Sequence, residues 1–494
     1  MGQLYDFKGQ ILTEDFDENI GFFKRLFDKD DVFRIRKLTV SRGREYRIAV
    51  MFMDGMVNTE VLNQSVIRAL LTNGETPKQG DLTEYIKDEV LFANEVSSTL
   101  DISEMLSAVF YGDTLLIAEG SRRGLLINTK GWRTRGVSEP SDERVLQGPR
   151  EGFDEALMLN VALIRRKLPT PDLRVELMRA GRKTDTRMFL CYLDSVVNKS
   201  LVREIKKRIE AIDIDGVLDS NYINELIKGR RWSLFKTAGS TERPDIVAAR
   251  LLEGRVALLV DGTPVALTIP YLFSENFQAD DDYYVNFLVA GVGRVLRYVC
   301  FFLSISVPAI YLGLIIYHPH LLPTTFAVTV SKARGGIPFP SYVECFLLTV
   351  VFEILRETGI RMQQSVGHAL SIVGGLVVGQ AAVEAKIVSA PMLIVVALSG
   401  ICGLMIPRLK GAILYARFGL IVLATLFGLY GYFIGMTLLL YALFSLDSFG
   451  VDYVGSLEAL TPQSLKDTLV RAPWWKMFTR PLGLTKNIYR QRRR

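Results

Sequence analysis

Long apolar runs and short alternating segments divide the chain into two unlike parts. Charge-free runs occupy 298–317, 387–407 and 418–446, and 366–383 carries one ionisable group, His368. A bilayer core of about 30 Å requires roughly 20 helical residues, so each run is long enough to cross or nearly cross it. Helices of a soluble core would show a polar residue at every third or fourth position, which these runs lack. The last two fifths of the chain therefore predict a membrane domain.

The first part alternates short apolar strands with amphipathic helices, and it does so twice. The segment 52–67 matches 192–207 as a strand followed by a helix, and 111–127 matches 253–269 as two strands joined by a tight turn. From the aspartate of the first segment to the glycine of the turn there are 66 residues in one copy and 68 in the other. This agreement predicts two related α/β subdomains.

Taken together, the two parts predict an α+β/α membrane protein. Duplicated cytosolic α/β subdomains are followed by an all-α polytopic membrane domain of about four to five helical segments. In chain order, we expect an N-terminal extension (1–29), a first α/β subdomain (30–132), a polar linker (133–154), a second α/β subdomain (155–284), a transmembrane helical domain (285–446) and a basic C-terminal tail (447–494).

The charge balance changes sign at the same boundary. Residues 1–286 carry 40 Lys and Arg against 45 Asp and Glu, whereas 287–494 carry 19 against 8. The last 24 residues hold eight Lys or Arg and no acid. Basic tails beside membrane segments mark the cytoplasmic side, and the charged N-terminus lacks the apolar run of a signal peptide. We therefore expect both the N-terminal domain and the tail in the cytosol, and the alternative of nucleic-acid binding is not favoured.

Small residues recur at helical spacing within the apolar part. Ser371, Gly375 and Gly379 lie four residues apart, and Gly431 and Gly435 form a second pair. In lipid, helices associate through close backbone approach at small residues, so these glycines predict helix-packing seams. A glycine-rich face could also line a narrow pore, and the two interpretations are compatible.

Ionisable groups inside a membrane are costly and mark interfaces or ion paths. Glu344 and Glu353 lie nine residues apart, and at about 100° per residue they occupy opposite faces of one helix. An interfacial cluster of paired charges is predicted for Glu353, Arg356, Glu357 and Arg361. Glu344 has fewer oppositely charged neighbours than Glu353. The candidate ion path therefore consists of Gln380, Glu344 and Ser371, with the amide of Gln380 expected to be buried.

The number of membrane crossings restricts the arrangement further. If both ends of the chain are cytosolic, the number of full spans is even, yet five helical segments are visible. The segment 339–361 carries Glu344 and Glu353 within its apolar part and is entered through the sequence GGIPFPS (335–341). We expect it to be a re-entrant or steeply tilted helix, which is tolerated only beside protein or water.

Enzyme signatures are absent from the sequence. There is no phosphate loop, dinucleotide fingerprint, nucleophile elbow or HExxH motif. Three histidines and four cysteines lack metal-type spacing. We therefore expect a non-enzymatic protein without a cofactor or a metal site.

Four segments resemble one known family. GPREGF (148–153), TERPDIVAARLLEGRVALLVDGTP (241–264), FEILRETGIR (352–361) and SIVGGLVVGQAAVEAKIVSAPMLIVVAL (371–398) are similar to the A subunits of GerA-type spore germinant receptors. The resemblance implies a multi-pass protein of the bacterial spore inner membrane. It also implies a transporter-like B subunit and a lipoprotein C subunit as partners, and a homo-oligomer that forms a gated channel releasing monovalent cations.

Two departures from the family pattern leave the receptor type open. Lys236 stands where the family commonly has proline, and 363–368 replaces a proline- and glycine-containing stretch. A stage V sporulation AF-like paralogue shares the same motifs. A secondary transporter would require inverted repeats within the membrane part and a helix broken at the midplane, and the visible duplication lies only in the first part. A scaffold with a passive anchor would need only one span.

Overall fold

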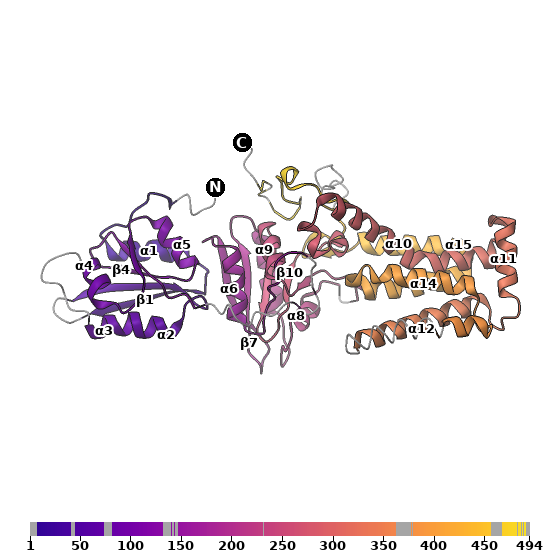
Figure 1. The fold of residues 1–494 in the computed structure, drawn as a ribbon, viewed down its shortest axis with the longest axis horizontal. Coiled ribbons are helices and arrows are strands. Elements are labelled where there is room, and N and C mark those ends of the chain that lie inside the picture. Colours follow the sequence, from indigo (N-terminus) through magenta and orange to yellow (C-terminus); the bar gives the residue numbers. More distant parts are fainter. Residues whose placement is uncertain are drawn as a thin grey trace.

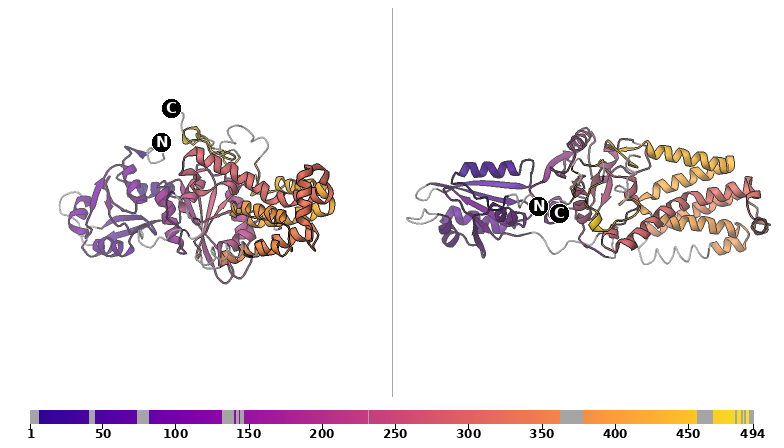
Figure 2. Two further views of the ribbon diagram at one scale, coloured as in Figure 1. Left: turned by 45° about the vertical axis from the view of Figure 1, so that its right-hand side comes forward. Right: turned by 90° about the horizontal axis from the view of Figure 1, so that it is seen from above.

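Three bodies follow one another along the long axis of the molecule (Figures 1 and 2). The computed structural model describes residues 7–40, 45–73, 82–131, 140, 143, 147–230, 232–361, 377, 379–455, 467–481, 483–485, 487, 489 and 490. Two α/β bodies come first in the sequence, and a bundle of helices forms the other end of the molecule.

The first body contains a five-stranded antiparallel sheet in the order β1-β2-β4-β5-β3. Its strands are β1 (Phe33–Val40), β2 (Tyr46–Met53), β3 (Val96–Thr99), β4 (Thr114–Ala118) and β5 (Gly124–Ile127). Alternate residues of β2 point to opposite faces: Ala49 and Met51 pack against one set of helices, and Ile48 and Val50 pack against another. Because both faces are covered, the central strands are almost entirely apolar.

Helices cover both faces of this first sheet. On one face lie α1 (Phe16–Leu26) and α5 (Ile102–Phe110). The other face is covered by a helical segment comprising α2 (Thr59–Val61), a π-helical stretch Leu62–Arg68 and α3 (Ala69–Asn73), and by α4 (Leu82–Tyr85) with the π-helical stretch Ile86–Val90.

The second body repeats this arrangement. Its sheet has the order β6-β7-β9-β10-β8, which is the same order as in the first sheet. The strands are β6 (Leu173–Ala180), β7 (Thr186–Leu193), β8 (Gly239–Thr241), β9 (Val256–Val260) and β10 (Ala266–Ile269). The helices α6 (Leu157–Lys167) and α9 (Pro244–Leu252) cover one face, and α7 (Lys199–Glu210) and α8 (Ser220–Ile227) cover the other.

Residues matched between the two sequence copies occupy equivalent places. Asn58 caps the N-terminus of α2, and Asn198 caps that of α7, each by accepting hydrogen bonds from backbone N–H groups of the first turn. Gly120 and Gly262 lie in the turns β4–β5 and β9–β10 with φ of 79° and 84°, a backbone conformation that favours glycine. The duplication inferred from sequence thus corresponds to two bodies of the same topology.

A buried ion pair joins the two α/β bodies. Arg165 of α6 lies 2.5 Å from the carboxylate of Asp30, and neither side chain has exposed surface. The same guanidinium donates to the carbonyl of Leu173 at 3.3 Å. The charge of Arg165 is therefore balanced by a residue from the segment before β1.

The thiol of Cys191 lies close to this pair and supports a first prediction. Burial raises the pKa of Cys191 to about 12, although Arg165 lowers it. We expect less than one per cent thiolate at pH 8, so native protein should leave Cys191 unmodified by iodoacetamide while the unfolded chain reacts. Peptide mass spectrometry before and after denaturation measures this, and stoichiometric labelling of native protein at Cys191 would contradict it.

The third body is a bundle of helices. It contains α10 (Phe287–Tyr317), α11 (Thr324–Arg334), α12 (Ser341–Arg361), α14 (Ala390–Leu404) and α15 (Lys410–Phe444). Figure 1 shows α11 lying across the end of the bundle that is far from the α/β bodies. Among the described residues, two stretches are long and apolar enough to cross a membrane, Phe287–Tyr317 and Pro407–Phe444, and Ala390–Leu404 is a shorter apolar helix. The expected four to five membrane segments thus stay a prediction.

The last apolar run, expected as one span over 418–446, instead doubles back on itself. Gly428 interrupts α15 with φ 62° and ψ −144°. A Cβ atom at Gly435 would lie 2.7 Å from the side chain of Leu420, whereas a continuous helix would separate these residues by about 22 Å. The expectation was wrong because the two halves are equally apolar, so the hydropathy of the sequence does not show where the chain reverses.

Both ends of α15 consequently return to the second α/β body. Arg408, just before α15, donates to Asp280 at 2.6 Å. Beyond its other end, the hydroxyl of Ser448 donates to the carbonyl of Thr237 at 2.6 Å. Ser448 belongs to a short hairpin of β11 (Asp447–Ser448) and β12 (Val451–Asp452). The turn at Gly428 lies beside Tyr317, the last residue of α10.

Candidate functional site

Arg417 is the centre of a polar cluster inside the helical bundle. Its side chain is 1% exposed. The Nε atom donates to the carbonyl of Ser304 in α10 at 2.8 Å, and a terminal nitrogen donates to the carbonyl of Ser399 in α14 at 3.2 Å. The other terminal nitrogen lies 3.3 Å from the carboxylate of Glu353 in α12. One guanidinium of α15 therefore contacts three other helices.

Three of the residues in the predicted charge cluster, Glu353, Arg356 and Glu357, lie on α12. Arg356 contacts the second carboxylate oxygen of Glu353 at 2.5 Å. Glu357 pairs with Lys410, at the start of α15, at 2.8 Å. The side chain of Arg361 lies outside the described part of the structure. Two acids of α12 thus each bind a cation from α15.

Glu344 occupies the opposite end of α12. It is buried, and one of its oxygens accepts hydrogen bonds from both the backbone N–H and the hydroxyl of Ser389, at 3.0 and 2.8 Å. Arg334, the last residue of α11, lies 3.8 Å from its other oxygen. Expected from sequence as the less compensated acid, Glu344 therefore has partners from α11 and from the N-terminus of α14.

The remaining predicted residues fall in different surroundings. Gln380 was expected to be buried, but its side chain is exposed and donates to Glu384 at 2.9 Å, one helical turn further on. Gly379 is buried, and a Cβ atom there would lie 3.5 Å from Leu393 of α14. Ser371 and Gly375 lie outside the described residues. The structure therefore does not bring Gln380 and Glu344 together around one described passage.

The second predicted glycine pair lies within a single chain. Gly431 and Gly435 are both buried in the seam between the two halves of α15. A Cβ atom at Gly431 would collide with the main-chain carbonyl of Leu423 in the first half. These glycines therefore permit the close approach that holds the hairpin together.

A second set of charges connects the bundle to the α/β bodies. Arg408 lies 3.5 Å from the carboxylate of Glu143, in addition to its bond to Asp280. Glu143 also accepts hydrogen bonds from the hydroxyl of Thr241 and the backbone N–H of Glu242, at 2.6 and 3.0 Å. Burial raises the pKa of Glu143 and so does Asp280, whereas Arg408 lowers it. A residue of the linker between the two α/β bodies thus contacts the α14–α15 connection.

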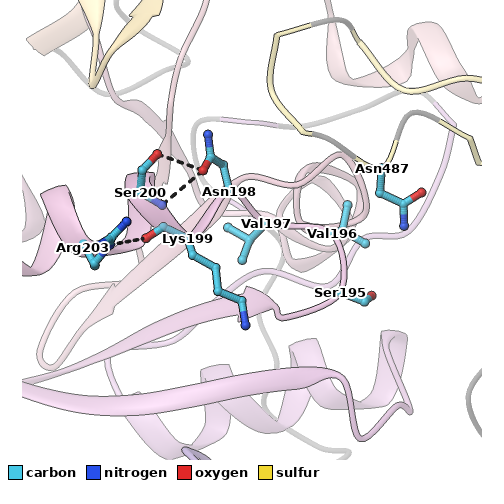
Figure 3. Close-up of a pocket in the computed structure, with 8 residues that line it drawn as sticks. All are labelled: Ser195, Val196, Val197, Asn198, Lys199, Ser200, Arg203 and Asn487. Carbon is cyan, nitrogen blue, oxygen red and sulfur yellow. Dashed lines mark hydrogen bonds between the residues drawn. The ribbon is translucent and has the colours of Figure 1, made fainter.

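A surface hollow of about 600 Å³ opens beside the start of α7 (Figure 3). Its polar groups largely serve the helix: Oδ1 of Asn198 accepts from the backbone N–H and the hydroxyl of Ser200 at 3.1 and 2.8 Å. Asn487 of the C-terminal segment forms another part of the wall. Across the described residues, no group of three His, Cys, Asp or Glu side chains could hold a metal ion.

Similarity to one protein family extends over both α/β bodies and the bundle. Residues 22–482 match the family model described as Bacillus/Clostridium GerA spore germination protein. The chain belongs to the GerA family. This confirms the resemblance inferred from the four sequence segments.

Several relatives within and beyond Bacillus subtilis are similar over most of their length. Spore germination protein KA of B. subtilis (strain 168) is 37% identical over 478 residues, covering 96% of this chain and 88% of the relative. Spore germination protein B1 of the same strain is 34% identical over 472 residues, covering 95% and 97%. The uncharacterized membrane protein YfkQ of that strain is 40% identical over 434 residues, covering 87% and 84%.

One solved structure is also similar. It is the crystal structure of the N-terminal domain of the A subunit of the Bacillus megaterium spore germinant receptor GerK3, at 31% identity. The alignment covers 53% of this chain and 98% of that chain, with a TM-score of 0.42.

Proposed function

We propose that this chain is the A subunit of a spore nutrient-germinant receptor, which lies in the spore inner membrane and triggers germination. The observation that carries the proposal is the family match over residues 22–482, because it includes the α/β bodies and the apolar bundle together. Several copies form a gated channel that releases monovalent cations, and a transporter-like B subunit and a lipoprotein C subunit complete the receptor.

The polar cluster supports a role for the bundle beyond anchoring. Burying Arg417 and Glu353 among apolar helices carries a desolvation cost that a passive anchor has no need to meet. The pair links four helices at one point, so a change in the position of one helix affects the others. Glu344 holds the opposite end of α12 in the same way.

The hairpin of α15 supports a topology in which the chain enters and leaves the bundle on the same side of the membrane. Arg408 and Ser448 contact the second α/β body from the two ends of α15. The α/β bodies and the basic tail then lie on the core side of the membrane. The break at Gly428 lies beside the end of α10, not halfway along it, and this does not favour the broken helix of a secondary transporter.

Deleting the gene tests this function in spores of the organism that encodes it. We expect the mutant spores to lose the response to at least one amino acid, sugar or nucleoside, measured as loss of optical density and release of K⁺. Restoring the wild-type gene should restore both responses. To exclude compensation, all paralogous receptor genes are deleted from both the mutant and the strain that keeps this gene. If the mutant spores then respond to every nutrient as fast as the spores that keep the gene, the proposal is overturned.

A further inference from the structure

The first turns of α10 have their polar and apolar residues on the wrong sides for a helix in water. Leu288, Val289 and Val292 are 65%, 66% and 72% exposed. Arg294 is completely buried, and the side chain of Arg297 is 16% exposed. A helix at a protein–water boundary shows the reverse arrangement, with its charges outward and its aliphatic side chains inward.

The two arginines are neutralised inside the protein. Arg294 lies 3.0 Å from the carboxylate of Asp467 and 3.4 Å from that of Asp282. Arg297 lies 2.9 Å from Asp282. No charge of these turns is therefore left on the outward face.

The C-terminal segment runs along the same turns and adds two tryptophans. A Cβ atom at Gly291 would lie 3.1 Å from Val470. The ring of Trp475 packs edge-on against Phe287, with 5.7 Å between ring centroids. Trp474 and Trp475 are nevertheless 51% and 71% exposed.

Arg471 fixes the position of this tryptophan pair. Its guanidinium donates to the carbonyl of Val285 at 2.7 Å and lies 5.5 Å from the ring of Trp474. It also lies 5.8 Å from the ring of Tyr283. The tryptophans are thus held beside the N-terminus of α10, and Lys476 follows them on the surface.

We propose that this surface, which we name the α10–tail patch, binds the headgroup interface of an anionic lipid bilayer. The patch consists of Leu288, Val289, Val292, Trp474, Trp475 and Lys476. Exposed tryptophan beside aliphatic side chains is typical of the membrane–water interface. The patch is continuous with the apolar run of α10, and its exposed Lys476 provides a cation that complements anionic headgroups.

The length of α10 agrees with this placement. Its 31 residues span about 46 Å, which exceeds a hydrocarbon core of about 30 Å. The extra turns therefore reach the headgroup layer or tilt into it. In the sequence the charge-free run begins only at residue 298, because Arg294 and Arg297 precede it, although the transmembrane domain was expected from residue 285. The burial of both arginines leaves an uncharged outward surface on α10 from Phe287 onward.

Tryptophan fluorescence of the full-length protein in vesicles tests the patch. The chain contains four tryptophans, so a Trp132→Phe/Trp232→Phe variant reports only Trp474 and Trp475. The vesicles contain phosphatidylcholine with or without phosphatidylglycerol. Quenching is measured with lipids brominated near the headgroup and, separately, with aqueous iodide. We expect brominated lipid to remove most of the emission and iodide to remove little.

Two control variants make the result decisive. A variant that keeps only Trp232, which is 97% exposed on the second α/β body, should show the opposite pattern. A variant with all four tryptophans replaced and Phe302→Trp in the middle of α10 reports the bilayer itself. Because the inference rests on the proposed membrane location, an unquenched Phe302→Trp would overturn that location, whereas quenching there but not at Trp474 and Trp475 would overturn only the patch.

The remaining outcomes also distinguish what covers the patch. Emission protected from both quenchers would mean that protein, such as a second copy or another subunit, covers the tryptophans, and would overturn lipid binding. Equal quenching in neutral and anionic vesicles would overturn the part assigned to anionic headgroups. A Lys476→Gln variant should then lose part of the difference between the two kinds of vesicle.

Discussion

Replacing Arg417 with methionine is expected to destabilise the folded bundle by about 3–5 kcal/mol. The change removes the guanidinium that hydrogen-bonds the carbonyls of Ser304 and Ser399 and pairs with Glu353. Methionine fills much of the volume but provides no donor. The two carbonyls lose partners, although Ser304 keeps the bond from the hydroxyl of Ser399, and Glu353 loses one of its two cations but keeps Arg356.

Equilibrium unfolding in mixed micelles, followed by fluorescence, measures this loss. The matched control is Lys410→Met, which breaks the exposed pair with Glu357 and should cost about 0–1 kcal/mol. Adding Glu353→Gln to Arg417→Met should recover none of the stability, because Arg356 still pairs with Glu353 in the single variant and would lose its anion in the double variant. If both single variants lose the same small amount, the cluster does not hold the bundle together.

The duplicated α/β bodies could be predicted from sequence because helix-capping and turn residues recur at the same spacing in both copies. Asn58 and Asn198 both cap a helix after a strand, and Gly120 and Gly262 both lie in a tight turn. Cap and turn residues act on their immediate neighbours, so their spacing along the chain is preserved in the fold.

The polar cluster could be predicted only in part, because its centre lies outside the acidic helix. Spacing within α12 pointed to Glu353 and Arg356 as neighbours. Arg417 is the one charged residue between Lys410 and Asp447, and this isolation was the available signal. Its partners on α10 and α14 are main-chain carbonyls. Every residue has such a carbonyl, so the sequence does not indicate which ones Arg417 contacts.

The placement of the tail was not predictable for the same reason. Arg471 binds the carbonyl of Val285, and Arg480 binds that of Leu252. A run of basic residues predicts attraction to anionic surfaces, but it does not say that two of its arginines are used within the chain. Gln380 illustrates the opposite error: a polar residue in an apolar run was expected to be buried, and its partner Glu384 lies on the surface beside it.

Replacing Gly431 with alanine is expected to open the α15 hairpin, at a cost of about 3 kcal/mol or more. The added methyl group would collide with the main-chain carbonyl of Leu423. A side chain could rotate away, but a carbonyl within a helix is fixed by its own hydrogen bond. The two halves must therefore separate, and the contact between Gly435 and Leu420 is lost with them.

Spin labels on the two halves report this opening directly. Tyr415 and Tyr441 are 62% and 73% exposed, and each lies 13 residues from Gly428. In a hairpin they lie at the same distance from the turn, with helix axes about 8–10 Å apart, whereas a continuous helix would separate them by about 39 Å. The wild type should give a short distance distribution between labels at these two positions, and Gly431→Ala should broaden it towards long distances.

Gly419→Ala is the matched control, because a Cβ atom there meets nothing within 4 Å. It introduces the same methyl group into the same helix, and its higher helix propensity should stabilise α15 by about 0.5–1 kcal/mol. A long distance in the wild type would show that α15 is a single span. A short distance in both variants would show that the halves tolerate a side chain at Gly431, so that the seam does not depend on close backbone approach. Only a change confined to Gly431→Ala attributes the reversal of the chain to glycine at this position.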